Sequence, residues 1–129
     1  MEKYILSEDF PLFIDQIRSF MTSDNVIAID VNDLFVFLEA NQDHKHSYVM
    51  HYSFHGATED ICKEILKLPS DYTSALYTLD GAINFFDPNE VGSALMDHCS
   101  AERVSLKMGV KYNAEQKENI VNVYLFFKQ

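Results

Sequence analysis

The chain has 129 residues, the length of one ordinary domain with a single core, so a second domain is not expected. Apolar residues make up 47% of it and aromatic residues 13%, which excludes an intrinsically disordered protein. Lys and Arg total 10 against 20 Asp and Glu, and the resulting net charge of −10 repels phosphate, which disfavours nucleic-acid binding.

The cysteine count and the N-terminus predict a cytoplasmic protein with no membrane contact. Cys62 and Cys99 are too few for a disulfide framework or a thiolate metal site, and they suit a reducing compartment. The first ten residues lack the basic and apolar segments of a signal peptide. No apolar run has the length that spans a bilayer.

The first third of the chain predicts two helices separated by an acidic loop. Residues 9–21 place apolar side chains at helical spacing, with Asp9 as the cap and Pro11 in the first turn. An apolar run then breaks at Asp30, and a helical pattern resumes after Asp33.

The rest of the chain alternates strands and helices. Strict alternation over 46–54 and residues suited to a sheet over 74–79 predict strands. Helices are expected over 58–68, capped by Thr58, and over 88–99, capped by Asp87. Two final strands, 104–110 and 120–127, are expected to form a hairpin with a long polar loop, the second being covered on both faces.

This order predicts an α+β fold with a mixed four-stranded sheet and helices packed mainly on one face. The whole chain, 1–129, forms one domain, with a leading helix over 9–21 and the sheet with its helices over 26–127.

Asp30 and Asp33 have two competing interpretations. An Asp at a helix start accepts hydrogen bonds from unpaired backbone N–H groups and suits the positive end of the helix dipole. Alternatively, both carboxylates point outward and meet another molecule. The sequence leaves both roles open.

From about Leu12 to Phe127 the element order resembles the C-terminal domain of the FtsZ family, the bacterial tubulin homologues. The similarity lies in the order and spacing of several features together. These are the loop with Asp30 and Asp33, the strand near Tyr48 to Phe54, the helix ending at Pro69-Ser70, the strand and helix from Ala75 through Leu95, and the final hairpin with Gly109 in its first strand.

The resemblance implies a site and a partner. In FtsZ an Asn-x-Asp-x-x-Asp loop reaches into the nucleotide site of the next subunit and completes GTP hydrolysis there. Asp30 and Asp33 match its two acidic positions, whereas Ala28 stands where the family has Asn. GTP itself binds to a separate N-terminal domain through a glycine-rich loop, and a chain with four glycines offers no such loop.

The resemblance therefore implies a lone C-terminal half, either an orphan domain or a part of a longer protein, that binds no cofactor and is no stand-alone GTPase. Its implied role is a non-catalytic interaction module. It would bind an FtsZ- or tubulin-like protein, or itself, and modulate filament assembly in cell division or a related cytoskeletal process.

Two other classes of function stay open. The net charge suits an acidic inhibitor or immunity-type protein that binds a basic effector. A small-molecule or metal-dependent enzyme is the further alternative, because imidazoles are common metal ligands. Its weak candidates are His44, His46, His51 and His55. On an extended strand His51 and His55 share a face that His46 does not, so the four are not expected to converge.

Overall fold

The computed structural model describes residues 1–22, 25–30, 32, 34, 47–81, 87–101 and 104–128. Five strands form one mixed sheet in the order β1-β2-β5-β3-β4. All neighbouring strands are antiparallel except β3 and β4, which are parallel. The strands are β1 (Glu2–Ile5), β2 (Ser47–Gly56), β3 (Ser74–Gly81), β4 (Ser105–Tyr112) and β5 (Asn119–Lys128).

The mixed α+β sheet confirms the predicted fold class, with two differences in detail. A fifth strand, β1, pairs with β2 at the edge of the sheet, where four residues are too few for a visible alternation. The predicted final hairpin is wrong, because β3 lies between β4 and β5 and pairs with both. Alternation of side chains tells which face a residue occupies, but it does not tell which strand lies beside it.

The first helix begins earlier than predicted. Helix α1 runs over Leu6–Ile17 and continues as a 3-10 turn, η1, over Arg18–Phe20. Asp9 is therefore not the residue before the helix. Its carboxylate lies in the first turn and accepts a hydrogen bond from the Ile5 N–H at 2.9 Å, so it still satisfies a backbone donor at the helix start.

The later helices begin where predicted, but α3 ends at Ile65 rather than at residue 68, and one of the two predicted caps is wrong. Helix α4 (Pro88–His98) is capped by Asp87, which accepts from the Asn89 N–H at 2.9 Å. Helix α3 (Thr58–Ile65) follows Ala57, which makes no side-chain cap. Thr58 instead accepts a hydrogen bond from the side-chain amide of Asn119 at 3.3 Å.

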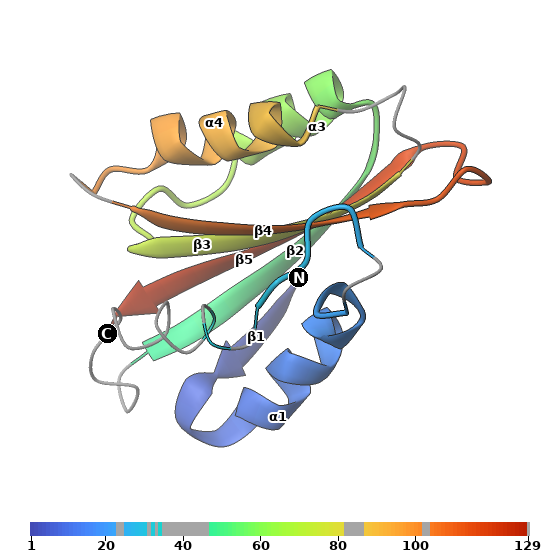
Figure 1. Ribbon diagram of the computed structural model, residues 1–129. Coiled ribbons are helices and arrows are strands. Elements are labelled where there is room, and N and C mark those ends of the chain that lie inside the picture. The colour runs from blue at the N-terminus through green and yellow to red at the C-terminus, as the bar shows by residue number, and fades with distance from the viewer. Residues whose placement is uncertain are drawn as a thin grey trace.

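The sheet has a helical layer on each face. Figure 1 shows α3 and α4 side by side over one face and α1 beneath the other, so the helices lie mainly, but not solely, on one side. Strand β5 is central, and its side chains alternate between the two cores. Val121, Val123, Leu125 and Phe127 face α3 and α4, whereas Tyr124 and Phe126 face α1. The prediction that this strand is covered on both faces is confirmed.

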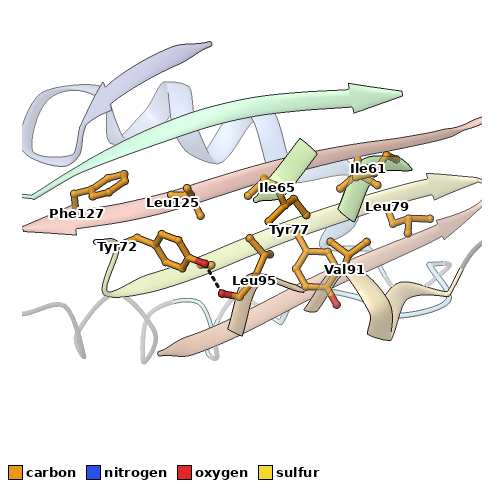
Figure 2. Packing of buried hydrophobic residues seen from close by; sticks show 12 residues of the cluster. Ile61, Ile65, Tyr72, Tyr77, Leu79, Val91, Leu95, Leu125 and Phe127 are labelled. Atoms are coloured by element: carbon orange, nitrogen blue, oxygen red, sulfur yellow. Dashed lines mark hydrogen bonds between the residues drawn. The ribbon is translucent and has the colours of Figure 1, made fainter. Parts of the chain in front are cut away.

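Figure 2 shows the core between the sheet and helices α3 and α4. Ile61 and Ile65 from α3 meet Val91 and Leu95 from α4 above the sheet, and all four are at most 1% exposed. The hydroxyl of Tyr72 donates to the backbone oxygen of Leu95, which ties α4 to the residues before β3. No helix in the described part of the chain is long and apolar enough to cross a membrane.

Candidate functional site

Residues 25–30 lie along the outer edge of β4. Ile27 and Val110 exchange backbone hydrogen bonds, with the Ile27 N–H donating at 3.1 Å and the Val110 N–H donating at 2.8 Å. Two residues later, the Ile29 N–H donates to the oxygen of Phe20 at 2.8 Å. Two backbone hydrogen bonds thus hold this segment to the edge strand β4, and a third holds it to η1, which together fix where Asp30 emerges.

The buried side chain of Ile29 also holds the segment against the protein. It is 3% exposed and packs in the core beneath α1. This packing depends on Gly109, because a Cβ at that position would lie 3.0 Å from Ile29 Cγ1 and 3.0 Å from Phe20 Cβ. Since ordinary van der Waals contact needs more room than this, glycine lets the segment lie close against β4.

Asp30 stands at the end of this segment and begins a helical turn. Its Oδ1 accepts from the Asn32 N–H at 2.7 Å, and its backbone oxygen accepts from the Leu34 N–H at 2.9 Å. Leu34 is 2% exposed and anchors the turn in the core. The structure therefore shows the cap bond for Asp30, while its side chain remains exposed to solvent. Asp33, the other predicted carboxylate, lies outside the described residues.

A cavity of about 250 Å³ lies beside Asp30, between residues 27–30 and β4. The predicted loop residues Ala28 and Asp30 line it, and Lys107 and Met108 from β4 form another wall. One carboxylate and one ammonium group around a partly apolar hollow can hold a polar side chain of a partner.

The two described histidines of β2 share a face, as predicted, but have separate surroundings. His51 is 9% exposed, stacks on Tyr124 with ring centroids 4.5 Å apart, and places Nε2 2.8 Å from Asn122 Oδ1. His55 is exposed, with Nδ1 3.3 Å from a Glu118 carboxylate oxygen. His44 and His46 lie outside the described residues. Within the described part of the chain, no three metal-binding side chains come together.

The sequence reasoning did not find a groove between α3 and α4. It has a volume of about 500 Å³ and is lined by both helices. Burial, followed by the charges of Glu90 and Asp87, raises the pKa of the Cys62 thiol in its wall. A signal for it is present in the sequence, because both helices carry acidic residues in their first turns, Glu59 and Asp60 in α3 and Glu90 in α4.

Comparisons with known proteins give structural matches only. No family model and no curated protein matches the sequence. A tryptophan-to-tyrosine mutant of FtsZ from M. jannaschii matches with a TM-score of 0.60 and 16% identity, covering 95% of this chain and 39% of that one. An empty FtsZ dimer from M. jannaschii matches with a TM-score of 0.56 and 12% identity, covering 94% and 38%.

The chain thus spans about two fifths of the length of the FtsZ chains that it matches. Identity this low shows a shared fold and leaves activity and partners to be tested. The chain has the FtsZ/tubulin C-terminal-domain fold that the order of its elements predicts.

Proposed function

We propose that this chain is a non-catalytic interaction module that binds an FtsZ- or tubulin-like protein through the segment ending at Asp30 and thereby modulates filament assembly. The observation that carries the proposal is an exposed carboxylate at the end of a backbone segment that is hydrogen-bonded to the sheet edge, within an FtsZ-like fold. One of the matched structures is an FtsZ dimer, which supports association of this fold with a second subunit.

Among the described residues, only one of the two carboxylate oxygens of Asp30 has a hydrogen-bond donor. Its Oδ1 binds the Asn32 N–H, whereas its Oδ2 accepts no hydrogen bond from the described residues. Lys107 lies in the wall of the adjoining cavity and adds a donor of opposite charge. A partner surface that presents a donor to Asp30 and an acceptor to Lys107 fits this pair.

The effect on filaments is blocking or capping of an end rather than completion of GTP hydrolysis. The FtsZ loop begins with Asn, but this chain has Ala28 there, whose methyl group neither donates nor accepts a hydrogen bond. A subunit that docks without completing the neighbour's catalytic site occupies a filament end and adds no turnover.

The test mixes the purified chain with a GTP-loaded FtsZ-type protein from the same organism. We expect less FtsZ in the pellet and slower phosphate release at amounts of this chain well below one per FtsZ, because one blocker stops a whole filament end. If neither quantity changes even at equal concentrations, the proposal is wrong.

Self-association is the alternative partner choice, and it predicts a different result. Two copies that each carry a charge of −10 repel one another, so dimers would form more readily as salt screens the charge. Sedimentation velocity of the chain alone at low and high salt measures this. A dimer at high salt, with no effect on FtsZ, would assign the site to a second copy of this chain.

A further inference from the structure

The groove between α3 and α4 is lined by apolar and by acidic side chains. Its apolar lining comes from Cys62 of α3, from Leu66 directly after α3 and from Ala94 of α4. Leu66 is 60% exposed, although it follows a helix whose other apolar residues, Ile61 and Ile65, are buried. The groove therefore leaves a large aliphatic side chain in water that a partner could cover.

The charged groups that line this groove are mostly negative. Lys63 supplies the one ammonium group in the described lining. The four carboxylates in the lining belong to Glu59, Asp87, Glu90 and Asp97. The Lys63 ammonium lies 3.9 Å from a carboxylate oxygen of Glu59, so these two charges partly offset each other. The carboxylates of Glu90 and Asp97 have no hydrogen-bond or ion-pair partner among the described residues. They lie on the same face of α4, two turns apart, at i and i+7.

We propose that this groove binds a basic amphipathic helix of another protein, with aliphatic side chains between α3 and α4 and Lys or Arg side chains against Glu90 and Asp97. A helix presents apolar residues at i, i+3, i+4 and i+7 as one stripe, which matches a groove between two helices. Basic residues beside that stripe then reach the two carboxylates. This site lies on the opposite face of the sheet from α1 and is independent of the Asp30 segment (Figure 1).

A second copy of this chain is a poor occupant. The whole chain carries a net charge of −10, and a copy seated in the groove would bring carboxylates against carboxylates. Complementary charge points to a basic partner, for which the same carboxylates give orientation and a faster encounter.

The first experiment compares two peptides on the unaltered chain. One probe is an amphipathic helical peptide of leucine and lysine, and the other has the same leucines with glutamate in place of lysine. Fluorescence anisotropy at roughly physiological salt should show binding of the lysine peptide that weakens as salt rises. Equal binding of the glutamate peptide, or no binding of the lysine peptide at about 1 mM, would overturn the proposal.

The second experiment locates the charges that attract the peptide. Glu90→Lys with Asp97→Lys should weaken binding of the lysine peptide by about tenfold or more. The control with the same change in net charge is Glu8→Lys with Glu115→Lys, at two exposed carboxylates outside the groove. If the control pair weakens binding as much as the groove pair, only the overall charge matters and the site is wrong.

The third experiment tests the apolar contact. Leu66→Ser should weaken binding several-fold, whereas Leu12→Ser, at a leucine of α1 that is 57% exposed, should leave it unchanged. Equal effects of the two substitutions would contradict a binding site for the peptide at Leu66. Asp30→Asn should bind the peptide as tightly as the unaltered chain does. The peptide experiments therefore test the groove separately from the filament experiment, which tests Asp30.

Discussion

The two oxygens of the Asp30 carboxylate have different surroundings. Oδ1 completes a helix cap at 2.7 Å from the Asn32 nitrogen, and Oδ2 has no partner in the described part of the chain. The cap was one of the two roles that the sequence predicted for this residue. The other role, contact with a partner, stays a prediction, because no partner surface is present to test it.

Substitutions at Asp30 should separate the cap from the charge. Asp30→Ala removes the acceptor and should lower the free energy of unfolding by about 1 kcal/mol, whereas Asp30→Asn keeps an oxygen in place and should change it by only a few tenths of a kcal/mol. Urea unfolding of both variants measures the difference. Equal losses in the two variants would mean that the cap bond contributes no stability.

Gly109 is the residue on which the position of the Asp30 segment depends. Gly109→Ala places a Cβ 3.0 Å from Phe20 Cβ and from Ile29 Cγ1, so one of them must move. We expect the free energy of unfolding to fall by about 1–3 kcal/mol, as overpacked cores do. Ser93→Ala, on the exposed face of α4, is the control and should stay within about 0.5 kcal/mol of the unaltered chain. An equally stable Gly109→Ala variant would show that Ile29 and Phe20 can shift to make room for the added methyl group at no cost in stability.

Among the helices and strands, those with a long and regular sequence pattern are the ones that the sequence predicts. The alternation in β2 gives a clear period of two, the continuous apolar run of β5 is typical of a strand buried on both faces, and both strands form where expected. Strand β1 has four residues, of which only Tyr4 is buried, so no period is visible. The placement of β3 between β4 and β5 depends on burial of whole faces and on chain crossing, neither of which one segment encodes.

The contact between α4 and the sheet is shaped by Gly92. A Cβ there would lie 2.8 Å from the hydroxyl oxygen of Tyr77, which itself donates to the backbone oxygen of Pro88 at 2.7 Å. Gly92→Ala gains helix propensity of about 1 kcal/mol but forces α4 away from this hydroxyl. We expect a net loss of about 1–3 kcal/mol in the free energy of unfolding.

A double-mutant cycle tests whether the hydroxyl of Tyr77 is the cause. In the Tyr77→Phe background the 2.8 Å contact is absent, so Gly92→Ala should cost less by at least about 0.5 kcal/mol. Both backgrounds are measured by urea unfolding. An unchanged cost would place the strain at Leu106, whose Cδ2 would lie 3.1 Å from the same Cβ.

For the whole molecule, buried tyrosines couple stability to alkaline pH. Burial, together with the hydrogen bond to Glu2 and the nearby carboxylates of Glu2 and Asp9, raises the pKa of Tyr4 to about 12. Burial raises the pKa of Tyr77 to about 12 as well, against a backbone hydrogen bond at Gly92 that lowers it. Burial also raises the pKa values of Tyr72 and Tyr124, so both cores contain such groups.

The sign of the pH effect follows from these shifts. A tyrosine whose pKa is higher in the folded chain contributes stability that is complete below pH 10, the ordinary value, and is lost as pH rises toward about 12. We expect urea midpoints to fall across this window. Tyr77→Phe should make the fall shallower, because one ionising group is gone. An equal slope in the variant would mean that Tyr77 ionises alike in the folded and unfolded chains.

The proposed function requires this chain, with its FtsZ-like fold, to act on filaments through the Asp30 carboxylate. The most direct measurement is the amount of FtsZ-type protein pelleted with GTP in the presence of the unaltered chain or Asp30→Asn, which keeps the cap and removes the charge. We expect the unaltered chain to reduce the amount of pelleted FtsZ-type protein. The Asp30→Asn variant, although about equally stable, should need at least about tenfold more protein for the same reduction. Equal action by both, or action by neither, would contradict it.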